Sequence, residues 1–277
     1  MSDISIRAII GDGIPTELLI TSALKQLDAN PVEVYVFSKN EIRRRELSQR
    51  YGVKTFENPQ LLSKAQIVTI AIFPDEFQKI IPQIKDFVAK DALIVSMVYG
   101  LTISELEKIF PNRPVIRVIA NPFMISGVGT CAYTTGSINS ADADGIAQMI
   151  LSAFGKIIKV NTEEELQNVQ DVTFAETILS YHLIESMIEG SMKAGLTSEK
   201  SIEIVTQVLA GAIATITDKD AKSKEFIDNA KNDKASQLMI NHAKEIIDKY
   251  HMWGLLKDSY DDKTPPNSKI LKLHYHW

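Results

Sequence analysis

Short apolar runs alternate with charged or amphipathic segments through the first 120 residues of the chain. The runs are residues 4–10, 31–37, 66–72, 92–98 and 114–119. They are rich in β-branched and aromatic side chains, which predicts buried strands. Strands this apolar are covered on both faces by helices, so the pattern predicts a parallel sheet.

The segments between these strands carry helix signals. A helix over 41–51 is expected to end at Gly52, a good residue just beyond a helix C-terminus. An amphipathic helix over 75–88 is expected to break or kink at Pro82. Thr102 opens a capping-box sequence and therefore predicts the start of a short helix.

The pattern changes in the second half of the chain. Residues 128–134 and 156–160 predict edge-side strands, with a helix over 141–153 between them. Beyond residue 160 hardly any strand signal remains. Helices are expected over 163–190, 197–217 and 231–253, followed by an irregular tail from Asp258, and Gly195 is one of the breaks.

The helix over 197–217 is apolar on nearly all sides, which indicates burial by more than one neighbour. In a small helical domain that neighbour is often another subunit. We therefore predict an α/β Rossmann-like domain, residues 1–160, followed by an all-α dimerisation and substrate domain, residues 161–277, and a homodimer formed through the C-terminal helices.

A glycine pair follows the first strand. Gly11 permits a tight turn, and Gly13 lets the backbone approach a pyrophosphate at the N-terminus of the next helix. Ile14 and Pro15 begin that helix. A proline is tolerated in the first turn, because the N–H group that it lacks would have no partner within the helix. The third glycine position of a dinucleotide fingerprint is occupied by Thr16, so an ordinary tight turn is the alternative reading.

Composition narrows the functional class. The net charge of −5 offers no basic field for nucleic acid, and no apolar run is long enough to predict a membrane span. The N-terminal residues lack the pattern of a signal peptide. The single cysteine, Cys131, excludes an internal disulfide and is expected to be a buried structural thiol, which fits a cytoplasmic location.

Several segments together resemble one family. They are Ala71-Ile-Phe-Pro74, Val95-Ser-Met-Val-Tyr-Gly100-Leu-Thr-Ile, Arg117-Val-Ile-Ala-Asn121-Pro122, the stretch from Ile184 to Leu196, and Gln207-Val-Leu-Ala-Gly-Ala. In order and spacing over roughly residues 4–220, they resemble the pyrroline-5-carboxylate reductases. The resemblance implies a Rossmann domain, a helical dimerisation domain, and hydride transfer from NAD(P)H to a small cyclic imine, as in proline biosynthesis.

The chain departs from that family at both substrate motifs. A Ser-Gly-Ser-Gly-Pro-Ala-Tyr loop should follow Thr173, and the chain instead continues with Phe174-Ala-Glu-Thr-Ile-Leu-Ser-Tyr181. A Ser-Pro-Gly-Gly-Thr-Thr segment should lie near 228–238, and no glycine or proline occurs there. The resemblance implies an imine reductase, and these departures leave open whether its substrate is pyrroline-5-carboxylate itself or whether the chain is a relative that has lost activity.

Cofactor choice should be decided at the end of the second strand. Ser38, Lys39 and Asn40 stand there without an acid among them, and Arg43 follows in the next turn. A hydroxyl, an amide and cations can receive a 2′-phosphate, so we expect NADPH, with NADH as a possible second cofactor. The alternative is that the arginines of residues 43–45 form a solvated helix face.

The family resemblance also implies that Ala71, Phe73 and Pro74 line the path from adenosine to nicotinamide. Asn121 follows the fifth strand at the same sheet edge and could orient the nicotinamide or a substrate group through its amide. Core packing is the alternative for Phe73, and capping of a turn is the alternative for Asn121.

Candidates for substrate chemistry lie in the altered segment that replaces the first substrate loop. They are Glu176, Thr177, Ser180, Tyr181 and His182. We select Glu176 and Thr177 as catalytic candidates, because a carboxylate could hold a cationic iminium nitrogen and a carboxylic acid could protonate a neutral imine. A solvated helical glutamate is the alternative. The five histidines show no metal-ligand spacing, so no metal is expected.

Three hypotheses therefore remain open at the level of sequence. The first is an NAD(P)H-dependent imine reductase. The second is a non-catalytic dimeric relative that binds nucleotide and serves in regulation or interaction. The third is a dehydrogenase acting on a carbonyl or hydroxy acid, for which no lysine or histidine stands in the expected place.

Overall fold

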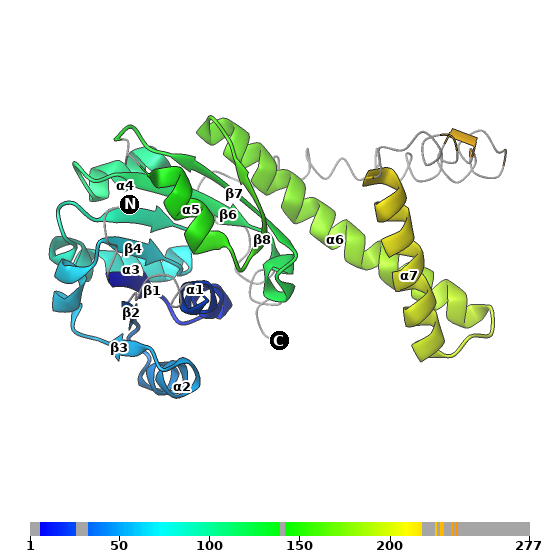
Figure 1. The fold of residues 1–277 in the computed structure, drawn as a ribbon, viewed down its shortest axis with the longest axis horizontal. Helices are drawn as coiled ribbons and strands as arrows, with labels where there is room; N and C mark the ends of the chain where they lie inside the picture. Colours follow the sequence, from blue (N-terminus) through cyan, green and yellow to red (C-terminus); the bar gives the residue numbers. More distant parts are fainter. Residues whose placement is uncertain are drawn as a thin grey trace. The chain divides into compact units, whose positions relative to one another are not determined.

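The computed structural model describes residues 6–25, 33–138 and 142–217, with five single positions between 225 and 237. The described residues divide into two compact units at Phe174 and Ala175, within one long helix. An eight-stranded sheet with its helices forms the first unit, and the described part of the second unit is helical (Figure 1). The predicted fold class is confirmed, whereas the domain boundary near residue 160 stays a prediction.

The sheet has the strand order β3-β2-β1-β4-β5-β6-β7-β8. Its strands are β1 (Ile6–Ile10), β2 (Glu33–Phe37), β3 (Lys54–Phe56), β4 (Ile67–Ile70), β5 (Leu93–Ser96), β6 (Val115–Ala120), β7 (Gly129–Thr135) and β8 (Gly155–Lys159). Neighbouring strands are parallel except β6 and β7, which are antiparallel. The carboxyl ends of the parallel strands β1 to β6 therefore share one edge, where open α/β sheets bind ligands.

Helices cover both faces of this sheet. Successive strand residues point to opposite sides, and apolar residues on both sides need to be covered. Ile9 of β1 belongs to one apolar cluster, whereas Ala8 and Ile10 belong to the other. The first cluster includes residues of α1 (Ile14–Leu24), α2 (Glu41–Tyr51) and α5 (Ala143–Leu151). The second includes residues of α3 (Pro74–Ile84) and α4 (Ile103–Ile109). Burial on both faces explains why the strands read as continuous apolar runs.

The helix boundaries follow the local sequence signals in all but one place. Gly52 ends α2 in the left-handed conformation, with φ +69°. The Thr102 hydroxyl accepts the Glu105 N–H at 3.2 Å, and the Glu105 carboxylate accepts the Thr102 N–H at 2.8 Å, so the predicted capping box is confirmed. The expected break at Pro82 does not occur, because α3 continues to Ile84 before a 3₁₀ turn takes over, whereas the alternative of a kink stays a prediction.

Three elements were not predicted. The short strand β3 pairs with β2 at the sheet edge, and a 3₁₀ helix, η1 (Pro59–Lys64), follows it. The third is the 3₁₀ helix η3 (Pro122–Ser126), which follows β6. Only Phe56 of β3 is buried, against the Phe37 ring at 5.5 Å between centroids. A three-residue strand with a single buried side chain carries almost no periodic signal, which explains why it escaped prediction.

Helix α6 (Glu163–Lys193) begins in the first unit and is anchored there to the sheet. The guanidinium of Arg117, on β6, donates to the Glu163 carboxylate at 2.7 Å and to the Gln167 amide oxygen at 3.3 Å. Arg117 is buried, with 2 % of its surface exposed. An ion pair this enclosed fixes where the long helix starts.

Helix α7 (Ser198–Thr217) follows a break at Gly195, as expected. The expected burial of this helix by neighbours that include another subunit stays a prediction, because a single chain does not test it. Only Ser201 and Val205 of this helix are buried, whereas Ile213 and Ile216 are 63 % and 71 % exposed. The helix expected over 231–253 and the tail from Asp258 lie outside the described residues, apart from Lys234 and Gln237.

Candidate dinucleotide site

The turn after β1 is tight because Gly11 lies against the end of β4. Gly11 has φ +141°, and a Cβ at this position would lie 2.4 Å from the carbonyl oxygen of Ala71. Its N–H donates to the Phe37 carbonyl at 3.0 Å, which ties the turn to β2 as well. No side chain fits where two strand ends approach this closely, so a glycine is required.

Gly13 has a different environment. It precedes α1 in an extended conformation, and a Cβ there would meet only the Pro15 Cδ, at 3.7 Å. The surrounding protein therefore gives no reason for a glycine at this position. Open space beside the first N–H groups of α1, where Ile14 and Pro15 begin the helix, fits the close approach of a pyrophosphate.

Thr16 fills the space that the third glycine of the fingerprint would leave empty. Its side chain is fully buried, and its Oγ1 lies 2.9 Å from the position of a Cβ at Gly11. Among the described groups Thr16 Oγ1 has no hydrogen-bond partner. The threonine thus packs behind the turn, on the protein side of the backbone that would face a pyrophosphate.

The end of β2 is organised around a buried hydroxyl. Ser38 Oγ donates to the Asp12 carboxylate at 2.6 Å and accepts the Asn40 N–H at 2.9 Å. Asn40 caps α2 by accepting the Arg43 N–H at 3.2 Å. The Lys39 ammonium lies 5.4 Å from the centroid of the Phe37 ring. The structure therefore brings the predicted Ser38, Lys39 and Asn40 together, and it adds Asp12, an acid that the strand-end sequence lacks.

Arg43 is held by protein groups on three sides. Its Nε and Nη2 donate to the Asp12 carbonyl at 3.1 and 2.8 Å, and its guanidinium forms ion pairs with Glu17 at 2.8 Å and Glu46 at 2.6 Å. A 2′-phosphate would have to compete with two carboxylates for this side chain. The alternative of a solvated helix face describes Arg45, which is 74 % exposed and pairs with Glu41 on its own helix.

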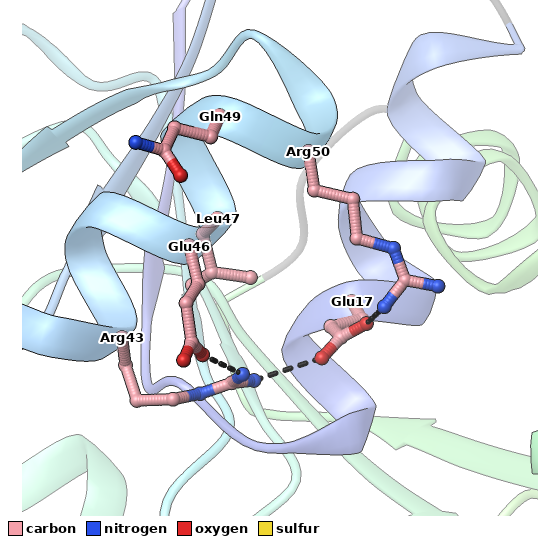
Figure 2. Close-up of a pocket in the computed structure, with 6 residues that line it drawn as sticks. All are labelled: Glu17, Arg43, Glu46, Leu47, Gln49 and Arg50. Carbon is pink, nitrogen blue, oxygen red and sulfur yellow. Dashed lines mark hydrogen bonds and ion pairs between the residues drawn. The ribbon is translucent and has the colours of Figure 1, made fainter.

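A surface pocket between α1 and α2 is centred on the same ion pairs (Figure 2). Its lining residues are Glu17, Arg43, Glu46, Leu47, Gln49 and Arg50. The Glu17 carboxylate accepts hydrogen bonds from Arg43, from Arg50 at 3.0 Å and from the Tyr51 hydroxyl at 2.6 Å.

Burial alone would raise the pKa of Glu17. The hydrogen bonds from Tyr51 and Arg43, with the charges of Arg43 and Arg50, outweigh burial and lower this pKa below its usual value. The carboxylate is therefore held in its ionised form between the two helices.

The predicted residues at the end of β4 border the same turn. Ala71 is 9 % exposed, and its N–H donates to the Ile10 carbonyl at 2.8 Å. Phe73 precedes α3, and Pro74 is the first residue of that helix. The Phe73 side chain is 39 % exposed, so the alternative of core packing does not describe it. An exposed aromatic ring at the carboxyl edge of the sheet suits contact with a bound ligand.

Asn121, at the end of β6, takes part in the reversal of the chain toward β7. Its Oδ1 accepts the Thr130 N–H at 3.0 Å, and its backbone N–H donates to the Thr130 carbonyl at 3.0 Å. The turn-capping alternative is therefore correct for the amide oxygen. Its cofactor role stays a prediction, now limited to the donor side of the amide.

The two catalytic candidates lie in the second unit, on α6. Glu176 is exposed and Thr177 is 1 % exposed. The helix is continuous from Glu163 to Lys193, so no loop interrupts it after Thr173. Beside them His182 is 74 % exposed, and its Nδ1 lies 3.8 Å from the Glu185 carboxylate. The catalytic roles of Glu176 and Thr177 stay predictions.

Other chemistry is sparse in the described part of the chain. Cys131 is fully buried on β7, and burial raises the pKa of its thiol to about 12, which agrees with a structural role. Within 6–25, 33–138 and 142–217, no three His, Cys, Asp or Glu side chains gather as metal ligands would. No helix in these ranges has the length and apolarity needed to cross a bilayer.

A family model of oxidoreductases matches the N-terminal part of the chain, which contains the candidate dinucleotide site. Residues 7–100 match the family model described as NADP oxidoreductase, coenzyme F420-dependent. A pyrroline-5-carboxylate reductase of Corynebacterium melassecola is 26 % identical over 226 residues, which are 79 % of this chain and 82 % of the relative.

Solved structures extend the match to the fold. A 1-pyrroline-5-carboxylate reductase from Streptococcus pyogenes superposes with a TM-score of 0.74 at 21 % identity, covering 91 % of this chain and 95 % of the other. The Plasmodium falciparum pyrroline carboxylate reductase, solved with NADP bound, gives 0.73 at 17 % identity, with 92 % and 96 % covered. In sequence and in fold, the chain is similar to the pyrroline-5-carboxylate reductases. The resemblance seen in the sequence is thereby confirmed.

Proposed function

We propose that the protein is an NADPH-dependent reductase that transfers hydride to the C=N bond of a small cyclic imine, with NADH as a weaker second cofactor. The main support for a nucleotide site is the pair of glycines after β1. Gly11 is required by the fold, whereas Gly13 leaves open space at the N-terminus of α1 that no protein group fills. The oxidoreductase class is supported by the matching family model and by the reductases named above.

The bound nucleotide would be held at both ends by this chain's own residues. The backbone from Gly11 to Pro15 faces the pyrophosphate, and Lys39 with Asn40 stands at the end of β2 for the adenosine ribose and its 2′-phosphate. Phe73 and Asn121, at the ends of β4 and β6, border the path toward the nicotinamide. NADPH supplies the hydride.

Hydride transfer proceeds best to an imine whose nitrogen is already protonated and cationic. Glu176 is proposed to hold that cationic nitrogen through its carboxylate, because it is an exposed acidic residue on the segment that replaces the family's substrate loop. A carboxylate at this place suits a substrate that carries a cationic nitrogen and lacks the usual carboxylate. Thr177 is 1 % exposed, so its proposed part is to position Glu176 and not to contact the substrate.

A homodimer through the C-terminal helices is part of the proposal. Large apolar side chains on α6 and α7 are exposed in the single chain. They include Leu179, Leu183, Ile202, Ile204, Val208, Ile213 and Ile216. Exposed large apolar side chains in this number support an interface with another subunit. The cytoplasmic location expected from the single cysteine belongs to the same proposal.

The first test is calorimetric titration of NADPH and NADH into the full chain and into Gly13→Val. Micromolar binding of NADPH, tighter than NADH, and its loss in Gly13→Val with unchanged thermal unfolding would support the proposal. Equal binding by Gly13→Val would overturn the site. A panel of cyclic imines then follows by NADPH oxidation, where Glu176→Gln should lower turnover at least tenfold while nucleotide affinity stays constant.

The continuous helix at the first substrate motif favours a second candidate, a nucleotide-binding relative without catalysis. In that case both cofactors bind as above, and no imine in the panel accelerates NADPH oxidation. Turnover with any one imine would exclude this candidate.

A further inference from the structure

An acidic side chain from the β1–α1 turn lies at the end of β2. Asp12, between the two glycines of the β1–α1 turn, accepts the Ser38 hydroxyl at 2.6 Å. Ser38 is 4 % exposed, and its Oγ also accepts the Asn40 N–H. The only proton of that hydroxyl is thus committed to a carboxylate and is not available to a phosphate.

An acid at this place has a known consequence for dinucleotide folds. A carboxylate at the end of the second strand accepts the 2′-hydroxyl of the adenosine ribose, whereas cations there accommodate a 2′-phosphate. Building on the proposed function, we propose that Asp12 is a specificity-determining residue at this position. Its carboxylate favours the 2′-hydroxyl of NADH and weakens the preference for NADPH.

The two arginines at this strand end are already paired with other carboxylates of the protein. Arg43 is bound by Glu17 and Glu46, and Arg44 donates to the Ser38 carbonyl at 2.8 Å and pairs with Glu57 at 3.0 Å. Across the described residues, neither Asp12 nor Lys39 forms an ion pair. The strand end therefore presents one negative and one positive side chain that favour different groups on the same ribose.

The test removes each charge in turn and measures binding. Asp12→Asn keeps an amide oxygen that can accept the Ser38 hydroxyl, but it loses the negative charge. Its dissociation constant for NADPH should fall about tenfold, while that for NADH stays within about threefold or rises. Lys39→Gln should weaken NADPH binding about tenfold and leave NADH unchanged. The effect of Asp12→Asn should shrink at high salt.

Asp86→Asn is the matched control, because it removes the same charge from an exposed residue beyond α3. It should change neither constant. Asp12→Ala provides a second variant if Asp12→Asn unfolds, and thermal unfolding without nucleotide identifies that case. The same shift toward NADPH is expected.

Equal changes for both nucleotides, or an unchanged ratio in every Asp12 variant, would overturn the role of Asp12 and leave the proposed function intact. Failure of the wild-type chain to bind either nucleotide would overturn both.

Discussion

The corner formed by the β1–α1 turn and the end of β2 contrasts with the helical unit. In the corner several polar side chains are partnered by groups of other elements. Arg43 alone contacts the Asp12 carbonyl, Glu17 and Glu46. On α7, by contrast, the large apolar side chains Ile213 and Ile216 are exposed, and few residues are buried.

The corner is stabilised by contacts of its own residues, so the backbone that would face a nucleotide is held in place beforehand. The described part of the helical unit leaves large apolar side chains of α7 exposed, and the proposed homodimer would bury them. We therefore expect substitutions in the corner to act on the isolated chain, and substitutions on α7 to act on assembly.

The largest effect is expected at Gly11. Gly11→Ala combines a positive φ with a Cβ placed 2.4 Å from the Ala71 carbonyl, so the variant should lose about 3 kcal/mol or more of unfolding free energy. Gly52→Ala is the control, because it shares a positive φ but has no atom within 4 Å of its Cβ. That control should lose only about 1 kcal/mol in denaturant unfolding. Equal losses would contradict the steric argument.

The contrast becomes sharper if assembly depends on α7. Ile213→Asp combined with Ile216→Asp should raise the dimer dissociation constant at least about 30-fold, because charges would enter an apolar interface. Light scattering across a concentration series measures the change. Ile42→Asp, on α2, alters a side chain that is 70 % exposed and should leave the mass unchanged. A monomeric wild type would refute the proposed interface.

A smaller effect is expected from Glu17. Because its pKa is lowered in the folded chain, its contribution is present above the usual carboxyl pKa and disappears as the pH falls through the folded value. Glu17→Gln should therefore cost about 1–2 kcal/mol near pH 7, and the gap to wild type should vanish in acid. Glu57→Gln, an exposed ion-pair partner of Arg44, should cost below about 0.5 kcal/mol.

The smallest expected effect is a gain. Thr16→Val keeps the shape of a buried side chain and removes a hydroxyl that has no partner in the described structure. The free energy of unfolding should rise by roughly 1 kcal/mol. Thr21→Val on the same helix removes a hydroxyl that donates to the Glu17 carbonyl at 2.8 Å, so it should bring no gain. A loss at Thr16 would indicate a hydrogen bond to bound solvent.

Much of the fold was predictable because its signals are local. The apolar runs, Gly52 and the Thr102 capping box all depend on neighbouring residues, and the structure has each of them. The strand β3 was missed since its stability comes from Phe37 and the sheet edge. The exposure of α7 in the single chain is in line with the expectation that another subunit covers it, but an apolar sequence alone does not say which surface that is.

The candidate site divides in the same way. The glycines and the strand-end residues Ser38, Lys39 and Asn40 were recognisable from spacing. Asp12 was not singled out, although it stands between the two glycines, because its relevance depends on a contact with Ser38 across 26 positions in the chain. The contacts of Arg43 with the Asp12 carbonyl and with Glu17 could not be predicted for the same reason. Spacing identifies which loops meet, but it does not assign the partner of each side chain.

The Arg43 bridge also has an evolutionary consequence. A single guanidinium ties the turn carbonyl of Asp12 to Glu17 of α1, and Glu17 is shared with Tyr51 of α2. Loss of Arg43 would leave a half-buried carboxylate with fewer donors, and loss of Glu17 would leave two cations facing each other. Among homologues that share this corner, substitutions at positions 17, 43 and 51 should therefore be correlated, whereas those at the exposed Arg45 should be independent of them.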